Sequence, residues 1–427
     1  MIPLAVKRTA RLVCFASSGF LALVQGLRVE VSRSAADETP RVFVLQPDDL
    51  ADVRKRLQSR DPSVLPAFNK LQREADRALD GGTFAVVNKD LLPPGGDKHD
   101  YMSIAPYWWP NPNTSGGLPY IRRDGEVNPE RDQTSDRKRL DNLVQGVKTL
   151  ALAYFFTSRE DYAAHAAKLL RVWFLDEATK MNPHLRYAQA IPGRNSGRGA
   201  GIIETHNLPE LIDAVGMLGG SKAWDAKQQT ALQDWFNAYL TWLLESPEGR
   251  AEAKAQNNHG NWYDVQIASF ALFVDKKEIA RRILSEMPAK RIAKQIEPDG
   301  RQPDELQRTQ AWTYSLFNLE ALFDAAAIAD KLGIDLWNYQ TRDGRGMRKA
   351  LDWLVPFATG EKKWSYQQIS GWHPETLAPF LRRAAVRYGD AKYDEAIGKL
   401  SGRITDHRMH LLFPPPAASK PNSSAAK

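Results

Sequence analysis

Cysteine is almost absent from this chain, and histidine is sparse. Among 427 residues there are one cysteine, Cys14, and eight histidines. Cys14 lies in an N-terminal stretch that we expect to be removed, so the mature protein would have no disulfide, no thiolate metal site and no cysteine nucleophile. His407 and His410 lie close together in the sequence, but no carboxylate pattern supports them as metal ligands. We therefore expect no metal-dependent chemistry and no other cofactor.

A long apolar run and a strong excess of one charge are also missing. The apolar stretch at residues 12–27 contains Ser17 and Ser18, and it is too short and too polar to span a membrane. The formal net charge is +7, but residues 1–36 hold five basic residues and one acidic residue, which leaves about +3 for the rest. That bias is too weak for nucleic-acid binding. With 43% hydrophobic residues, the composition predicts a soluble globular protein.

The two ends of the chain differ from its middle. In residues 1–36, basic residues at positions 7, 8 and 11 precede the apolar stretch, and the small residues Ser34, Ala35 and Ala36 follow it. This order is typical of a signal peptide and predicts a secreted or periplasmic protein, although a disordered extension is the alternative. The tail at residues 414–427, "PPPAASKPNSSAAK", is of low complexity and is expected to be disordered. A single domain over residues 40–413 remains.

Helical periodicity dominates that domain. The stretch "LDNLVQGVKTLALAYFFT" puts its apolar residues on one face, and a helix that begins at Asp48 or Asp49 is expected before it. No strand run and no Gly-rich phosphate loop is recognisable. Paired helices of this length predict an all-α fold of helical hairpins arranged in a ring, an (α/α) toroid. The other expected helices cover residues 160–175, 208–219, 224–245, 262–273, 276–287, 311–332, 347–358 and 375–402.

Three polar residues, Asn257, Asn258 and His259, precede the apolar helix at 262–273. We expect this helix to begin near Gly260 or Asn261, so that its free N–H groups and these side chains favour an anion. Trp262 follows directly and is counted with the substrate-binding residues. The alternative is an ordinary Asn cap beside a loop histidine that already has its hydrogen bonds.

A second group, Arg308 and Tyr314, lies at the start of another predicted helix in "DELQRTQAWTYSLFNLEAL". Arginine is a natural partner for a carboxylate, and a nearby positive charge favours the ionised form of a tyrosine. Together with Asn258 and His259, these residues fit β-elimination from a uronic acid. Neutralising the carboxylate makes the C5 proton removable, and a phenolate can take it and then donate it to O4. The alternative is a surface arginine and a core tyrosine.

The long loop at residues 83–136 contains "APYWWPNP", with the contiguous aromatic residues Tyr107, Trp108 and Trp109. Exposed aromatic rings in a loop need a partner, and the apolar face of a sugar ring is one. A hydrophobic plug at the end of the domain is the alternative. In "IIETHNLPE", we expect His206 to face the same cleft, with Glu204 equally well placed.

The motifs "NNHGNWYD", "APYWWPNP…GGLPYIRRDGEVNPE" and "ELQRTQAWTYSLFNLEAL" resemble the alginate-lyase-type polysaccharide lyases, in particular families five and thirty-eight, over residues 85–375. The resemblance implies an (α/α) toroid that cleaves an acidic polysaccharide by β-elimination. By matching motifs, Asn258 and His259 would handle the carboxylate, Arg308 would be the motif's arginine and Tyr314 the catalytic tyrosine. In family five the Arg-to-Tyr spacing is one residue longer, and serine replaces Gly260. Family thirty-eight acts on glucuronan or alginate.

Two other classes of protein compete with a lyase. A toroidal glycoside hydrolase needs two carboxylates flanking the scissile bond, for which Asp264, Asp299 and Glu305 are candidates without an evident pair. A sugar-binding protein without activity would keep the tryptophans, but the intact set of Asn258, His259, Arg308 and Tyr314 argues against it. The sequence therefore favours a lyase, and it does not choose between mannuronate and glucuronate.

Overall fold

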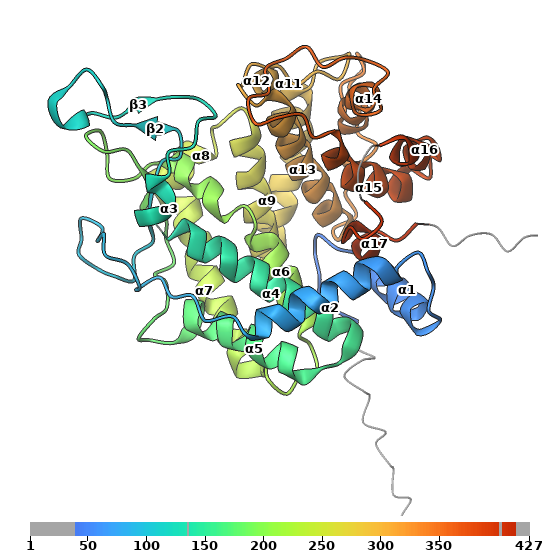
Figure 1. Ribbon diagram of the computed structural model, residues 1–427, viewed down its shortest axis with the longest axis horizontal. Coiled ribbons are helices and arrows are strands. Elements are labelled where there is room, and N and C mark those ends of the chain that lie inside the picture. Colours follow the sequence, from blue (N-terminus) through green and yellow to red (C-terminus); the bar gives the residue numbers. More distant parts are fainter. Residues whose placement is uncertain (1–38, 135, 401–403, 416–427) are drawn as a thin grey trace, which may run out of the picture.

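The computed structural model describes residues 39–134, 136–400 and 404–415, and it consists mainly of helices that pack as consecutive pairs (Figure 1). The expected leader lies outside the described residues, and so does the expected tail from residue 416 on. The helices are α1 Pro47–Gln58, α2 Leu65–Leu79, α3 Glu130–Thr134, α4 Arg137–Thr157, α5 Glu160–Leu170, α6 Leu208–Met217, α7 Ala226–Glu245, α8 Pro247–Glu252, α9 Asn258–Phe273, α10 Lys277–Met287, α11 Ala293–Gln295, α12 Pro303–Leu306, α13 Ala311–Asp330, α14 Met347–Ala358, α15 Ala378–Tyr388, α16 Lys392–Lys399 and α17 Met409–Leu412.

Most expected helices are present, but several elements differ from the expectation. Helix α2 was not expected from the sequence. The helix expected at 375–402 is divided, because Gly389 adopts a left-handed conformation at the end of α15 and α16 starts afresh. Helix α1 begins at Pro47 and no side chain caps it, so Asp48 and Asp49 lie in its first turn and are not its cap.

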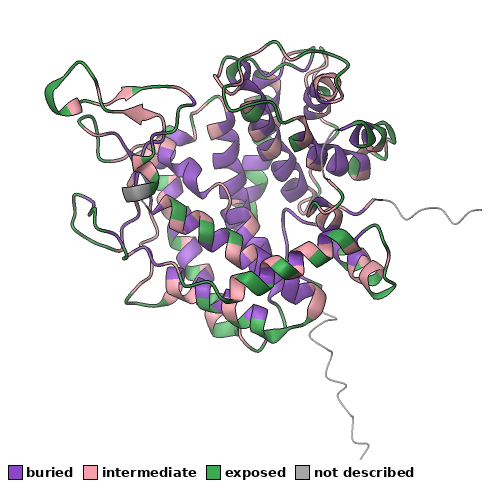
Figure 2. Cartoon of the chain, viewed as in Figure 1, coloured by how far each residue is buried: buried purple, intermediate pink, exposed green. Residues whose placement is uncertain are grey.

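Helices α9 and α13 form the centre of the molecule and pack side by side (Figures 1 and 2). In α9 every residue except His259 is buried, which is the pattern of a helix surrounded by protein on all sides. In α13 the less buried residues near the start, Thr313, Tyr314 and Phe317, lie within about one turn. The outer helices, such as α1 and α2, have one buried face and one exposed face (Figure 2).

Four short strands, which the sequence did not predict, occur in the described part of the chain. Strand β1, Met102–Ile104, pairs in parallel with β4, Tyr187–Ala190. Strand β2, Trp108–Trp109, pairs antiparallel with β3, Ile121–Arg122. At two to four residues they are too short to show an alternating pattern. We call residues 107–125, which contain β2 and β3, the arm; β2 and β3 lie at the edge of the molecule in Figure 1.

Asp213 of α6 attaches the N-terminal segment to the framework. Its carboxylate accepts hydrogen bonds from the backbone N–H groups of Phe43, Val44 and Leu45, at 2.6 to 3.0 Å. Burial raises the pKa of Asp213 to about 7 even though these N–H donors lower it. A buried carboxyl group therefore fixes the N-terminal segment to α6.

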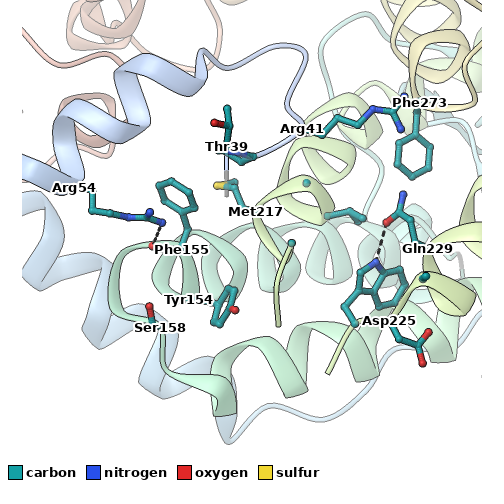
Figure 3. A pocket seen from close by; sticks show the side chains of 16 residues that line it. Thr39, Arg41, Arg54, Tyr154, Phe155, Ser158, Met217, Asp225, Gln229 and Phe273 are labelled. Carbon is teal, nitrogen blue, oxygen red and sulfur yellow. Dashed lines mark hydrogen bonds between the residues drawn. The ribbon is translucent and has the colours of Figure 1, made fainter. Parts of the chain in front are cut away.

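A cavity of about 320 Å³ lies where this segment meets α4, α6 and α7, with Thr39, Arg41, Phe155 and Met217 on its wall (Figure 3). Phe273, the last residue of α9, also lines it. Because α9 has 16 residues and a helix rises 1.5 Å per residue, the cavity lies roughly 20 Å from the first turn of α9. It is therefore separate from the polar residues at that first turn.

A larger pocket, of about 680 Å³, is lined by α2, α4, α6, α13, α15 and α17. Four of its charged lining groups are paired with one another, Lys148 with Glu210 and Arg383 with Asp324. On α13 it is bordered by Thr313 and Phe317, the near neighbours of Tyr314. Within the part of the chain that the structure describes, we find no helix with the length and apolar character needed to cross a membrane.

Candidate active site

Helix α9 starts at Asn258, two to three residues earlier than expected. Asn257 is the N-cap, and its side-chain oxygen accepts a hydrogen bond from the backbone N–H of His259 at 3.3 Å. Asn258 and His259 therefore lie inside the first turn of the helix and not in the loop before it. Their orientation is fixed by the helix, with Asn258 buried and His259 partly exposed.

Glu252, the last residue of α8, holds the His259 ring. Its carboxylate oxygen Oε1 lies 2.6 Å from His259 Nδ1, and only 4% of the glutamate surface is exposed. A carboxylate at Nδ1 retains the proton there and leaves Nε2 as the free, basic nitrogen. Glu252 was missed from the sequence, because a glutamate seven residues before a histidine has no distinctive pattern.

Glu305 of α12 holds Asn258 from the other side. The backbone N–H and the side-chain Nδ2 of Asn258 both donate to the Glu305 carboxylate, each at 2.8 Å. Burial raises the pKa of Glu305 to about 7, while the Asn258 donors and the charges of Arg308 and His259 act in the opposite direction. The glutamate considered as a hydrolase acid is thus bonded to the asparagine of the α9 motif.

A network of buried amides joins the start of α9 to α13. Asn261 donates from Nδ2 to Gln295 and to Asn318, each at 2.7 Å, and Asn318 donates to Gln302 at 2.8 Å. These four side chains are at most 5% exposed. Satisfied networks of this kind specify one arrangement of the helices, so the first turn of α9 has a fixed position relative to α13.

Gly260 permits a close contact at the same turn. A Cβ atom on this residue would lie 2.2 Å from the carbonyl oxygen of Ala255 and 2.2 Å from Nη1 of Arg291. Arg291 is fully buried and forms an ion pair with Asp264 at 2.7 Å. The glycine that distinguishes this chain from family five is therefore required by the packing around Arg291.

Tyr314 and Arg308 meet at the start of α13. The Arg308 guanidinium lies over the Tyr314 ring, 3.7 Å from its centroid. Its Nε and Nη2 atoms donate to Asp124 of the arm at 2.8 to 3.2 Å. We expected the Arg308 guanidinium to bind a substrate carboxylate, but it already binds a carboxylate of the protein.

The Tyr314 hydroxyl lies 2.5 Å from the hydroxyl of Tyr107, also in the arm. Burial raises the pKa of Tyr314 well above its usual value, Tyr107 raises it further, and Arg308 lowers it. The expectation that the arginine favours the phenolate is therefore right in direction, but burial outweighs it. Without substrate, Tyr314 is a neutral phenol.

The two groups of the site lie next to each other. Glu305, bonded to Asn258, interacts electrostatically with Arg308 and His259. His206 lies edge-on to Trp262 of α9 and to Phe317 of α13, at 5.0 and 5.1 Å between ring centroids. The structure thus brings the motif of α9 and the motif of α13 together.

The remaining predicted residues have different environments. Trp108 and Trp109 are partly exposed on β2, where the guanidinium groups of Arg194 and Arg123 lie near their rings. His206 is half-buried, and burial lowers its pKa to about 4. Trp262 is only 3% exposed and belongs to the aromatic core, so its ring face is not open to a sugar.

Glu204 does not face the cleft as expected. It is fully buried and accepts hydrogen bonds from Tyr101 and Ser103, at 2.7 and 2.6 Å. The other carboxylates considered for a hydrolase are no better placed, since Asp264 is buried against Arg291 and Asp299 pairs with Arg301 in an exposed turn. Among the residues described, no group of three histidine, cysteine, aspartate or glutamate side chains is arranged to hold a metal ion.

Comparisons with known proteins show the family and the fold of this chain. The family model "Alginate lyase" matches residues 85–364. A crystal structure of an alginate lyase from Bacteroides ovatus has a TM-score of 0.84 and 41% sequence identity, and the match covers 88% of this chain and 99% of that one. Among curated proteins, no match is found.

More distant structures share the fold. Alginate lyase A1-III from Sphingomonas species A1 has a TM-score of 0.51 and 16% identity, over 83% of this chain and 96% of that one. A variant of that enzyme in complex with a tetrasaccharide has a TM-score of 0.50 and 15% identity, with the same coverage. The family match covers more than half of the sequence, and the helical hairpins agree with it. This chain therefore belongs to the alginate lyase family, and it is a polysaccharide lyase built as an (α/α) toroid.

Proposed function

We propose that this enzyme cleaves alginate, or a closely related 4-linked polyuronate such as glucuronan, by β-elimination. The observation that carries the proposal is the meeting of His259 and Asn258 with Tyr314 and Arg308 at the starts of two packed helices. The Bacteroides ovatus relative, described as an alginate lyase, supports alginate as the substrate.

The first step is neutralisation of the uronate carboxylate. The first turn of α9 offers its positive dipole end, the Asn258 amide and the His259 ring to an anion. Neutralising the carboxylate stabilises the enolate-like intermediate that forms when C5 loses its proton. Arg308 contributes through Tyr314, because its stacked guanidinium favours the phenolate that serves as the base.

The second step is the elimination itself. Tyr314, a neutral phenol before substrate binds, first loses its proton to solvent. The phenolate then takes the C5 proton, the C4=C5 double bond forms, and the C4–O4 bond breaks. The new phenol then donates its proton to O4, which returns Tyr314 to the phenolate. A single residue in both roles requires the proton and O4 to leave from one face, as in mannuronate and glucuronate. For guluronate, His259 with Glu252 behind it is the better base and Tyr314 the acid.

Trp108, Trp109 and Tyr107 of the arm are proposed to bind the sugar rings beside the reacting one. Because β2 is paired to β3, the two tryptophans are held in place although they are partly exposed. Asn257 and His206 are proposed to contribute to substrate binding near the reacting sugar. Asn257 serves mainly as the N-cap of α9.

The test is a near-ultraviolet time course on polymannuronate, polyguluronate and glucuronan, with wild-type enzyme and Tyr314→Phe. Absorbance from the conjugated C4=C5 bond on one polymer, reduced about a hundredfold or more in the variant, would establish elimination and identify the substrate. New reducing ends without that absorbance would show hydrolysis and refute the proposal.

We further propose that the enzyme is exported, from the order of basic, apolar and small residues in 1–36. Expression with and without residues 1–36 in a Gram-negative host, followed by fractionation, tests this. Equal cytoplasmic retention of both forms would contradict it.

A further inference from the structure

The Asn258 side chain carries a buried oxygen without a partner. Asn258 is 1% exposed, and its backbone N–H and its side-chain Nδ2 both donate to Glu305. Within the described part of the chain, its Oδ1 atom accepts no hydrogen bond. A buried acceptor left without a partner costs about 1–3 kcal/mol, so such an atom calls for a functional explanation.

This orientation of the amide is the wrong one for a uronate. With Nδ2 turned to Glu305, the amide presents an oxygen, and an oxygen repels a carboxylate. Rotating the amide by half a turn exchanges Oδ1 and Nδ2 at nearly the same positions. The NH2 group is then free to donate to the uronate, but Oδ1 lies against the Glu305 oxygen 2.8 Å away. Two acceptors at that distance need a proton between them.

Glu305 is in a position to supply that proton. It is 1% exposed, and among the described residues Arg308, close to it in the chain, and His259 of α9 are charged or titratable side chains that act on it. Burial raises its pKa to about 7 against the effect of both. A uronate carboxylate brought to Asn258 is a further negative charge, and it raises the affinity of Glu305 for a proton again.

We propose that Glu305 is a positioning residue that works as the neutral acid: its O–H donates to Asn258 Oδ1 and so turns the amide NH2 toward the substrate carboxylate. The inference rests on the proposed β-elimination. Glu305 takes up one proton from solvent when the polymer binds, keeps it through the reaction and releases it with the product. It touches none of the reacting atoms.

The decisive variant is Glu305→Gln. Glutamine has the shape of the protonated acid, so its Oε1 can accept from the Asn258 backbone N–H while its NH2 donates to Asn258 Oδ1. We expect this variant to retain kcat/KM within about threefold of the wild type near pH 6. In the wild type kcat/KM should decline at alkaline pH as Glu305 ionises, and the variant should lose this part of the decline. Glu305→Ala should lose about a hundredfold or more, because nothing then orients the amide. Asp304 is an exposed neighbour on α12, and Asp304→Asn is the matched control. It should change neither kcat/KM nor its dependence on pH.

The result that overturns the proposal is a Glu305→Gln variant that folds like the wild type and is as inactive as Glu305→Ala, since the ionised carboxylate would then be required. Infrared difference spectroscopy gives a second readout that does not depend on turnover. The Tyr314→Phe variant, saturated with mannuronate trisaccharide near pH 6, should show a carboxylic-acid C=O band. The double variant that also carries Glu305→Gln should lack this band. Absence of that change would refute a neutral Glu305. Failure of the proposed function is seen separately, as wild-type enzyme that forms no C4=C5 absorbance on any polymer.

Discussion

The two halves of the active site are held in different ways. Asn258 and His259 are fixed by Glu305 and Glu252, which are 1% and 4% exposed and belong to the helical framework. Tyr314 and Arg308 are instead held by Tyr107 and Asp124, which belong to the arm. The half that handles the substrate carboxylate is therefore held by the core, within which the Asn258 amide rotates, whereas the half that moves the proton depends on a surface element.

The two halves also differ in how far solvent and salt screen their charges. The Arg308–Asp124 pair is partly exposed, at 14% and 21% of the two side chains, so solvent and salt screen it. Glu252 and Glu305 are shielded from solvent, and their effects on His259 and Asn258 should persist at high salt. Apart from Glu305→Gln, which keeps the shape of the protonated acid, variants in the framework should therefore reduce activity more than variants in the arm.

The largest effect is expected from Gly260→Ser. The new Cβ would overlap the Ala255 carbonyl and the Arg291 guanidinium, which displaces the turn that carries His259. We expect a loss of about 1–3 kcal/mol in the free energy of unfolding and a fall in kcat of a hundredfold or more. Urea unfolding and initial rates measure both. Gly398→Ala, where a Cβ meets nothing within 4 Å, is the control. Unchanged stability and rate would refute the packing argument.

The next effect is expected from Glu252→Gln. Loss of the carboxylate at Nδ1 weakens the control of the His259 tautomer and of the ring orientation. We expect kcat to fall about tenfold to a hundredfold with a small change in KM, most strongly on the polymer for which His259 is the base. Glu245→Gln, an exposed residue at the end of α7, serves as control. If only KM changed, Glu252 would have no part in orienting the base.

Asp124→Asn should have a smaller effect, because it loosens the arm without touching the framework. We expect a threefold to tenfold loss of kcat/KM, about 1 kcal/mol, together with a weaker dependence on salt. Burial raises the pKa of Asp124, but hydrogen bonds from Arg308 and Thr309 lower it to about 2. Its stabilising contribution is therefore present above the usual aspartate pKa and is lost only as the pH falls toward 2.

Rates at several salt concentrations test this prediction, with Asp299→Asn as the control for an ion pair in an exposed turn. A loss as large as that of Glu252→Gln would mean that the arm is as rigidly fixed as the framework.

The smallest effect is expected from Trp109→Ala. The ring is partly exposed, and its Nε1 donates to the Glu126 carbonyl at 2.9 Å. If it binds a sugar away from the reaction centre, KM should rise about threefold while kcat stays the same. The effect should vanish for oligosaccharides too short to reach the arm. A change in kcat alone would place this ring closer to the chemistry than proposed.

The sequence predicts the framework better than the arm. Helices such as α4 were recognisable because their apolar residues recur at helical spacing, and α9 and α13 because their runs are long. The arm strands are too short to carry a period. The predicted start of α9 lies too far along the sequence. The first residues of this helix are polar although most of them are buried, and the spacing of apolar residues does not reveal such a helical turn.

The site shows the same division. Asn258, His259, Arg308 and Tyr314 stand in local motifs and could be chosen from the sequence. The contacts between these residues and their partners could not be predicted, because Asp124 is 184 residues from Arg308 and Tyr107, although chosen as a sugar-binding residue, is 207 residues from Tyr314. Arg308 shows the consequence: its fork was expected to be free, and only the fold reveals that a protein carboxylate fills it.

The burial of α9 also limits how this enzyme can be redesigned. A helix surrounded by protein tolerates few replacements, and the one position of α9 that is not buried is His259 itself. Residues 107–125 include many exposed positions, and their contacts reach Tyr314 and Arg308 directly. A library that aims at a new polymer should therefore vary the arm and leave α9 as it is.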